Sequence, residues 1–437
     1  MAVVSPFRAC RYAPEQVPIR QVVTQPYDKI TPEMQESYYQ ANPYNLVRVI
    51  LGKRFPTDTA SENVYSRAAA AFQNWRQVGV LRQDPEPCLY RYSQTFSIPG
   101  SQSSAERRGF IALGRIEEYS AGVVFRHEQT LAKPKADRLD LLRATRAHFG
   151  QIFMLYSSGG KVDALLDSAI ANVALPDIEV SDEYGVLHKV WKISDPAVIA
   201  SVQEQMRDQK LIIADGHHRY ETALNYRNEN VGTRAEASSA SSPCDWVMMT
   251  FVDMDRPGLT ILPTHRVVFD LPVSVLEHFP TEARKFFNLE EIDAGVDGAR
   301  APAILRQARL AGTALLAVGG QRAFLLHTPK AIGSALFGNL SRRQQALDVV
   351  QLHKCLLEHC LRISEDAIRN QQNISYFRGA DEALAEVRSG KVQMAFLMNP
   401  VRIEQVRDIA FAGEVLPQKS TDFYPKLLSG LTIYALD

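Results

Sequence analysis

The sequence is poor in cysteine, in long apolar runs and in net charge. Its 437 residues include only five cysteines, an odd number, and no two of them have CxxC spacing. This pattern argues against a disulfide framework and against a cysteine-rich zinc site. No apolar run approaches the ~20 residues that a membrane span needs, and the first residues, MAVVSPFRACRYAPE, lack the apolar core of a signal peptide. We therefore expect a cytoplasmic protein without a membrane partner.

Neither charge sign is in excess, because Lys+Arg and Asp+Glu both number 49. A near-zero net charge without a long Lys/Arg stripe argues against a nucleic-acid partner. The length is sufficient for about two or three domains, and the hydrophobic content of 46% is sufficient for ordinary cores. Local basic clusters therefore have to be judged one by one.

Apolar periodicity predicts helices and strands that alternate irregularly along the chain. Helices are predicted at 32–41, 61–78, 137–147, 196–209, 216–230, 274–286, 301–310, 342–362 and 380–389. Strands are predicted at 45–52, 89–97, 109–116, 152–157, 187–193, 211–214, 246–253, 313–318, 322–327, 373–377 and 394–398. Irregular alternation with several hairpins predicts an α+β (mixed α/β) fold rather than a uniform doubly wound sheet. We expect an N-terminal α/β domain over residues 1–265 and a C-terminal α/β domain over residues 266–437.

The most informative stretch is LIIADGHHRYETAL, from Leu211 to Leu224. Its apolar start predicts a buried strand. Asp215 and Gly216 predict a tight turn, and a helix is expected to begin at about His218.

Two histidines and an arginine fall in the first turn of this helix: His217, His218 and Arg219. The amide dipoles already present positive charge at that end of a helix, so cations are unfavourable there unless something negative compensates. A phosphate or carboxylate held by the N–H groups and by Arg219 is the simplest compensation. In the alternative interpretation, Asp215 and Glu221 neutralise the cations and nothing binds.

A second polar cluster, RHEQTLAKPKADR at 126–138, follows a predicted strand end. Loops at strand ends often carry chemistry. Glu128 could serve as a general base or a Mg²⁺ ligand, and Lys133 could neutralise phosphate charge. His127 and Arg138 are further candidate phosphate ligands. The alternative is a solvated, salt-bridged loop.

A third cluster, LPQKSTDFYPK at 416–426, has some features of a P-loop. The glycine that a P-loop needs before its lysine is replaced by Gln418, and the following DFYP is poor helix sequence, so we reject that interpretation. A basic loop that carries Lys419, Ser420 and Lys426 toward a site remains open, as does an ordinary surface loop.

The segment LPTHR adds a second His-Arg pair, His265 and Arg266, which are candidate phosphate ligands. A tightly held metal is less favoured. Although His218 and Glu221 could share a helix face, no HExxH motif and no second histidine cluster accompany them. We assign no metal ligands and expect any Mg²⁺ to arrive with a nucleotide.

Six motifs together resemble a known family. DGHHRYETAL, HEQTLAKPKADRL, QPYDKI, NPYN, LPTHR and PQKSTDFYPKLLSG stand in the same order as in the bacterial and archaeal domain-of-unknown-function family 1015. The resemblance covers nearly the whole chain. Members of that family are often associated with serine biosynthesis genes, which makes serine or phosphoserine a candidate ligand.

The DGHHR motif also resembles that of the ParB-like/sulfiredoxin superfamily, which includes a free-serine kinase. This resemblance implies a ParB/sulfiredoxin-like core with large additions, and phosphate binding by Gly216, His217, His218 and Arg219. It further suggests Glu128 as the counterpart of that kinase's catalytic carboxylate.

The leading hypothesis is phosphoryl transfer on a small metabolite by a nucleotide-dependent kinase, with ATP or ADP, Mg²⁺ and free serine as the expected ligands. The expected catalytic residues are Glu128, Asp215, His217 and His218. A phosphatase or metal-assisted hydrolase is the alternative enzyme, and a non-catalytic nucleotide-binding regulator is the non-enzymatic alternative. A homodimer stays open.

Overall fold

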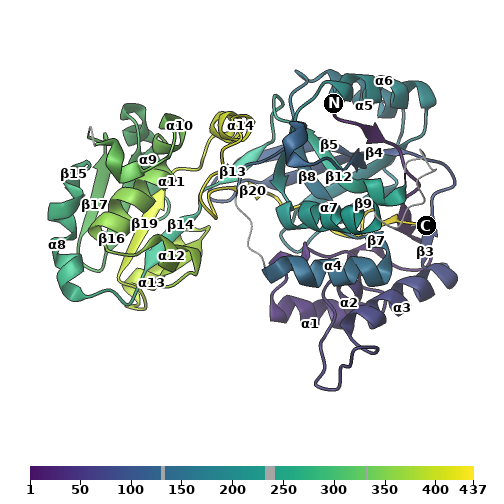
Figure 1. Ribbon diagram of the computed structural model, residues 1–437, viewed down its shortest axis with the longest axis horizontal. Coiled ribbons are helices and arrows are strands. Elements are labelled where there is room, and N and C mark those ends of the chain that lie inside the picture. Colours follow the sequence, from purple (N-terminus) through teal and green to yellow (C-terminus); the bar gives the residue numbers. More distant parts are fainter. Residues whose placement is uncertain (129–132, 232–241, 331–332) are drawn as a thin grey trace. The chain divides into compact units, whose positions relative to one another are not determined.

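The computed structural model describes most of the chain, and the described residues form two compact units (Figure 1). The described ranges are 1–128, 133–231, 242–330 and 333–437. The first unit comprises the described residues of Met1–Arg126, Thr130–Leu259 and Pro425–Asp437. The second comprises Thr260–Tyr424 together with the short piece around His127. Compared with the predicted division after residue 265, the contacts change units near residue 260, and the end of the chain returns to the first unit.

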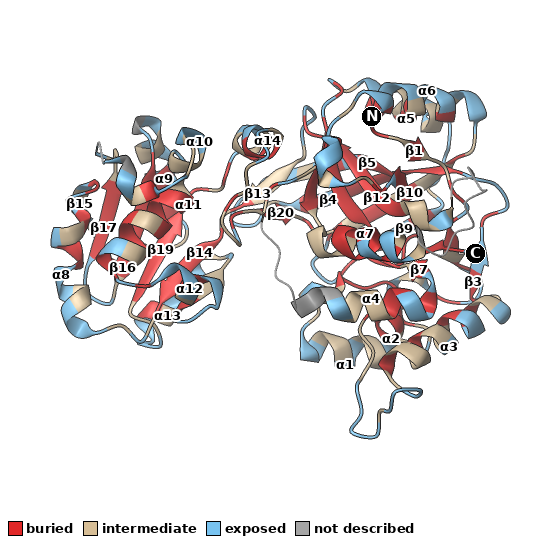
Figure 2. Cartoon of the chain, viewed as in Figure 1, coloured by how far each residue is buried: buried red, intermediate tan, exposed pale blue. Residues whose placement is uncertain are grey.

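A mixed sheet forms the centre of the first unit. Over the described ranges it has nine strands, in the order β6 (Val124–Arg126), β11 (Leu211–Asp215), β8 (Ile152–Tyr156), β12 (Trp246–Asp253), β5 (Ser104–Arg115), β4 (Leu89–Ser97), β10 (Leu187–Ile193) and β9 (Ile178–Ser181), with β1 (Val4–Ser5) against β5. β11 is parallel to β6 and antiparallel to β8. Most central strand residues are buried (Figure 2), so their apolar runs supply the core.

The helices of the first unit pack on this sheet and on one another. They are α1 (Pro32–Ala41), α2 (Val47–Ile50), α3 (Val64–Gln77), α4 (Lys133–Thr145), α5 (Lys161–Ile170), α6 (Pro196–Arg207) and α7 (His217–Val231). Apolar residues of α5, α6 and α7 join the sheet in one core, and those of α2, α3 and α4 form a second core. Two short strand pairs belong to this unit, β2 (Cys10–Tyr12) with β3 (Leu81–Gln83) and β7 (Ala147–His148) with β21 (Tyr434–Ala435).

The second unit has its own sheet and core. In the described part of this unit the sheet has six strands, in the order β15 (Asn288–Ile292), β17 (Ala323–His327), β16 (Ala314–Gly319), β19 (Met394–Met398), β14 (His265–Val268) and β18 (Ile374–Phe377). A separate pair joins β13 (Thr260–Leu262) to β20 (Asp422–Tyr424). The helices are α8 (Val273–Ala283), α9 (Ala301–Ala308), α10 (Arg342–Gln345), α11 (Asp348–Gln351), α12 (Glu365–Arg369), α13 (Ala380–Arg388) and α14 (Ile403–Phe411), with a π-helix at Leu352–Cys360.

The mixed α/β prediction is confirmed, and so is the predicted hairpin, in which β4 pairs antiparallel with β5. Two predicted elements were wrong. Residues 45–52 contain the short helix α2 instead of a strand, and the Asn45 side chain accepts the N–H of Val47 at 2.9 Å in an Asx turn that leads into this helix. Residues 342–362 form α10, α11 and the π-helix rather than one helix. The ParB/sulfiredoxin-like core stays a prediction.

Within the described ranges, no helix combines the length and the apolar content that crossing a membrane requires.

Candidate functional site

The site in the first unit is built around the turn between β11 and α7. β11 ends at Asp215, and α7 begins at His217, so the predicted strand, turn and helix are confirmed. Gly216 between them has a φ of 91°, which glycine adopts at little cost. A Cβ atom on Gly216 would also lie only 3.0 Å from the Nε of Arg219. A glycine is therefore needed both for the turn and for the approach of this guanidinium.

Two cations share the carboxylate of Asp215. The Nη2 of Arg219 donates to one oxygen at 2.7 Å, and the Nζ of Lys426 donates to the other at 3.0 Å. Arg219 also donates to the carbonyl of Gln151. Burial raises the pKa of Asp215, but Lys426 and Arg219 outweigh burial and hold this pKa well below its usual range. Asp215 is therefore ionised at neutral pH, and Arg219 and Lys426 share its single charge.

Lys426 is held in place by its backbone. Gln94 donates to the Lys426 carbonyl at 2.9 Å, and Arg107 donates both to Gln94 and to the carbonyl of Pro425. Burial lowers the pKa of Arg107 to about 10, so it is still charged at neutral pH. The sequence analysis did not identify Gln94 and Arg107 as residues that position Lys426. They lie in a strand pair whose sequence is that of an ordinary hairpin.

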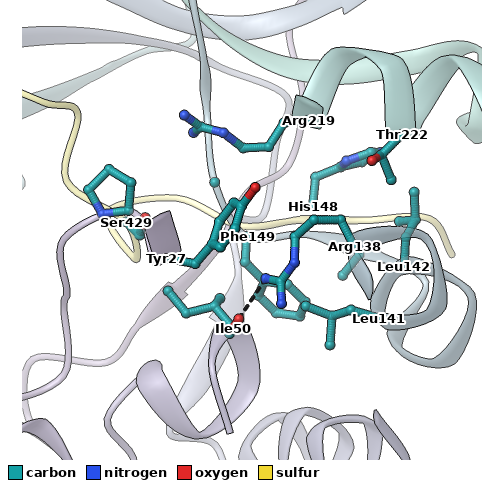
Figure 3. A pocket seen from close by; sticks show the side chains of 13 residues that line it. Tyr27, Ile50, Arg138, Leu141, Leu142, His148, Phe149, Arg219, Thr222 and Ser429 are labelled. Atoms are coloured by element: carbon teal, nitrogen blue, oxygen red, sulfur yellow. Dashed lines mark hydrogen bonds between the residues drawn. The ribbon is translucent and has the colours of Figure 1, made fainter. Parts of the chain in front are cut away.

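A small cavity of about 70 Å³ lies beside Arg219 (Figure 3). Its lining is mostly apolar, with a few polar groups from separate segments: Pro26, Tyr27, Ile50, Arg138, Leu141, Leu142, Ala147, His148, Phe149, Gly150, Arg219, Thr222 and Ser429. Thr222 is only 4% exposed, and its hydroxyl oxygen has no hydrogen-bond partner in the described part of the chain. A buried hydroxyl of this kind is a donor that an occupant of the cavity can use.

Arg138 approaches the same cavity from α4. Its Nη1 donates to the carbonyl of Ile50 at 2.6 Å, the contact that is dashed in Figure 3. Its guanidinium also lies 4.2 Å from the centre of the Tyr27 ring and is paired with Asp137. The structure thus brings Arg138, Arg219, Lys426 and Asp215 of the predicted residues together in the first unit.

His217 and His218 occupy the first turn of α7 and are half-buried. Their predicted catalytic roles stay predictions. The alternative in which Asp215 neutralises the cluster is realised in part, because Asp215 pairs with Arg219. Nevertheless, Arg219 lines a cavity at the helix start, where an anion is also favoured.

The other predicted motifs meet within the second unit. Glu128 accepts the backbone N–H of Lys419 at 2.8 Å, and the imidazole of His127 lies 2.7 Å from the hydroxyl of Thr421. Ser420 donates to the carbonyl of Pro417. β20 follows this loop where a P-loop would have a helix, so the rejection of a P-loop is confirmed.

Several predicted roles in this second cluster stay predictions. The general-base or Mg²⁺-ligand role of Glu128 is one of them, and phosphate binding by Lys419 and Ser420 is another. Lys133 begins α4, but its side chain lies outside the described part of the chain.

His265 and Arg266 are buried inside the second unit. Arg266 is fully buried and donates to the carbonyls of Thr264 and Lys419. His265 accepts the N–H of Met398, and burial together with Arg266 lowers its pKa to about 4. In this structure both side chains stabilise the second unit, and their predicted phosphate binding stays a prediction.

The described residues include no group of three or more His, Cys, Asp or Glu side chains that could hold a metal ion. Asp215 fits poorly as a Mg²⁺ ligand, because cations occupy both of its oxygens.

Comparisons with known proteins agree with the motif resemblance. Residues 4–350 match the family described as "Protein of unknown function (DUF1015)". No curated protein matches. The solved structures that are similar include a conserved hypothetical protein from Pyrococcus furiosus, with 13% identity and a TM-score of 0.33 over 69% of this chain and 87% of that one.

They also include a free serine kinase in complex with AMP, with 15% identity and a TM-score of 0.33 over 69% of this chain and 83% of that one. A third is SbnI with a C-terminal truncation from Staphylococcus aureus, with 10% identity and a TM-score of 0.35 over 74% and 87% of the two chains. Likenesses at this level do not establish a shared activity. The family match alone spans most of the sequence, and the chain therefore belongs to the DUF1015 family.

Proposed function

We propose that the turn between β11 and α7 is an anion site, and that the protein uses it to transfer a phosphoryl group to or from a small metabolite. The observation that carries this proposal is the pair of cations, Arg219 and Lys426, that share one carboxylate at the electropositive start of a helix. An anion that enters this turn meets both the helix dipole and a guanidinium.

When an anion binds at this turn, it would replace Asp215 as the hydrogen-bond partner of Arg219. A phosphate oxygen can take the place of the Asp215 oxygen that Arg219 now contacts at 2.7 Å, since a guanidinium binds either anion with the same donors. Lys426 stays paired with Asp215 meanwhile, so the carboxylate is not left without a cation. The buried hydroxyl of Thr222 offers a further hydrogen bond to an occupant of the cavity.

The size of the cavity limits what it can hold. Its volume of about 70 Å³ is far below the about 300–1,000 Å³ of sites that enclose a drug-sized ligand. The cavity as it stands therefore suits a phosphate group or a metabolite of the size of serine, and a nucleobase would have to lie outside it.

Phosphoryl transfer asks a protein mainly to position the reactants and to stabilise charge. Arg219 would clamp the transferred group, and His217 or His218 would donate hydrogen bonds or carry a proton near neutral pH. Removal of one preorganised charge of this kind typically costs about 3 kcal/mol in the barrier, which is about a hundredfold in rate.

The finer assignment is a kinase that uses ATP or ADP to phosphorylate free serine. It derives from the DGHHR motif, which resembles that of a free-serine kinase. Mg²⁺ would come with the nucleotide, and we assign it no step, because both oxygens of Asp215 are held by cations.

A phosphatase is the second candidate. The specific observation in its favour is the cavity of about 70 Å³, which admits a phosphate group and water but not a nucleobase. The same residues would then bind a phosphorylated metabolite such as phosphoserine, with water as the nucleophile. A regulator that binds a nucleotide without turnover is the non-enzymatic alternative.

One assay separates these functions. The purified protein is incubated with Mg²⁺ and either ATP or ADP, with and without L-serine, while nucleotide consumption and phosphoserine are followed. Serine-dependent phosphoserine formation supports the kinase, and phosphate release from phosphoserine alone supports the phosphatase. Ligand-induced thermal stabilisation without turnover supports the regulator. If the protein neither turns over nor binds any of these ligands, the proposal is wrong.

A further inference from the structure

The second unit contains a larger cavity that no role described above uses. Its volume is about 600 Å³, within the about 300–1,000 Å³ typical of small-molecule sites. The π-helix, α12 and the segment Val415–Gln418 contribute to its wall. It belongs wholly to the second unit and shares no residue with the β11–α7 site.

A buried histidine faces this cavity. His353 lies on the π-helix, is 7% exposed, and has a buried Nε2 atom without a hydrogen-bond partner among the described residues. Burial, with Arg266 and Lys354 adding to its effect, holds the pKa of His353 well below its usual range, so the imidazole is neutral. A neutral imidazole can accept or donate a hydrogen bond, according to its tautomer. π-Helical turns are rare and frequently occur at functional sites.

The lining includes charged side chains of both signs. Lys354 pairs with Glu358 at 2.9 Å and with Glu365 at 3.1 Å, and Arg369 pairs with Glu365 at 3.3 Å. Two cations and two carboxylates thus alternate within a short distance. Glu365 and Arg369 are 63% and 48% exposed, so they can change partners without leaving a buried charge behind.

The remaining lining is largely apolar. Phe337, Val350 and Leu416 are each at most 5% exposed and present carbon to the cavity. Such a surface favours an apolar body, whereas the alternating charges favour a ligand that carries both signs.

We propose that this cavity binds a zwitterionic small molecule with an apolar body, the simplest being a free amino acid with a branched or aromatic side chain. Its carboxylate would meet Lys354 or Arg369, its ammonium would meet Glu358 or Glu365, and His353 Nε2 would form a hydrogen bond with one of these groups. The apolar side chain would lie against Phe337 and its neighbours.

An occupant would also contact the segment that leads to Lys419. Leu416 lies in the cavity wall, and its N–H donates to the carbonyl of His127 at 2.8 Å. Glu128 accepts the N–H of Lys419 three residues later. The proposed ligand therefore touches the loop that carries the second predicted motif, although the proposal itself does not depend on any catalytic role for that motif.

The test is isothermal titration of the full chain with L-leucine, with L-phenylalanine and with N-acetyl-L-leucinamide, which keeps the apolar body but carries neither charge. We expect saturable binding of at least one free amino acid and at least tenfold weaker binding of the capped analogue. Glu365→Gln and Arg369→Gln each remove one exposed charge, should leave the fold intact, and should each weaken binding at least fivefold.

The matched control is Arg407→Gln, because Arg407 is a similarly exposed arginine (42%) on α14, outside the cavity lining. His353→Leu should abolish binding, and its thermal unfolding curve shows whether the variant is folded. The proposal is overturned if neither amino acid binds at millimolar concentration, or if the capped analogue binds equally well. Equal weakening by Arg407→Gln overturns it too.

Discussion

The two units use the same kinds of polar residue in different ways. In the first unit, Arg219 and Lys426 share one carboxylate beside a cavity, at a helix start that is already electropositive. In the second, Glu128 accepts a backbone N–H, and Arg266 donates to backbone carbonyls while fully buried. Side chains whose partners are backbone groups mainly hold loops together. Our proposal is that the cations grouped beside the cavity bind a ligand, whereas those of the second unit do not.

The variant with the largest expected effect is Arg219→Gln, which tests whether Arg219 acts on a ligand or only holds the fold. We expect phosphoryl transfer to fall about a hundredfold, because one preorganised charge is lost. We also expect a folded protein that is less stable by about 1–3 kcal/mol, because Asp215 and the Gln151 carbonyl each lose a hydrogen-bond donor. Steady-state rates and thermal unfolding check both expectations. Arg207→Gln is the control, since Arg207 is a 58% exposed arginine of the same unit. Unchanged turnover in Arg219→Gln would place this residue among the structural cations.

The pairing of Lys426 can be tested by stability. Lys426→Met removes one of the two cations that donate hydrogen bonds to Asp215, and we expect a loss of about 1–3 kcal/mol at neutral pH, since the pair is largely buried. Urea unfolding followed by circular dichroism measures it. Lys189→Met is the control, because Lys189 forms a more exposed pair with Glu179 at 3.2 Å, which should contribute at most about 1 kcal/mol.

The stability loss in Lys426→Met should depend on pH. Because the folded-state pKa of Asp215 is held below its ordinary value of 3.8, its contribution to stability is present above that pH and is lost as pH falls through the folded-state pKa. The stability difference between wild type and Lys426→Met should therefore be largest at neutral pH and should shrink below about pH 4. A difference that stays constant down to pH 2 would contradict the pairing.

Gly216→Ala tests whether the turn before α7 needs a glycine. A φ of 91° strains any residue with a Cβ, and that atom would press on the Arg219 guanidinium at 3.0–3.1 Å. We expect a loss of about 1–3 kcal/mol together with reduced activity. Gly159→Ala separates the two effects, because Gly159 has a φ of 62° but open space around it. That control should lose stability without losing activity.

The smallest effect is expected at Glu128. Glu128→Ala removes the acceptor of the Lys419 N–H and should cost about 1 kcal/mol in the unfolding of the second unit. Glu128→Gln retains an oxygen acceptor and should cost less. Thermal unfolding of the two variants measures the difference, and equal stability of Glu128→Ala and wild type would remove the structural role from this contact.

Sequence reasoning found the strand, turn and helix around Gly216 because their signal is local. The strand, turn and helix of DGHHR are consecutive in the chain, and the mismatch between cations and helix dipole is visible without a fold. Thr222 could have been found in the same way, since it follows Arg219 by three residues on one helix face.

Other parts of the site depend on long-range contacts. Gln94 and Arg107 act on Lys426 from more than 300 residues away in sequence, and nothing local in the hairpin marks them. Likewise, the strand prediction at 45–52 followed the apolar pattern, whereas the Asn45 side chain accepts the N–H of Val47 in a turn that leads into α2. Contacts also assign Lys419 and Lys426, which the sequence places in one loop, to different units, and whether they serve one site stays a prediction.

The central claim is that Arg219 binds an anion at the start of α7. Isothermal titration with inorganic phosphate and with phosphoserine tests it most directly, using wild type, Arg219→Gln and the Arg207→Gln control. The account predicts saturable binding of at least one of these anions to wild type and to the control, and at least tenfold weaker binding to Arg219→Gln. Equal affinity of wild type and Arg219→Gln, or no saturable binding to wild type, would contradict it.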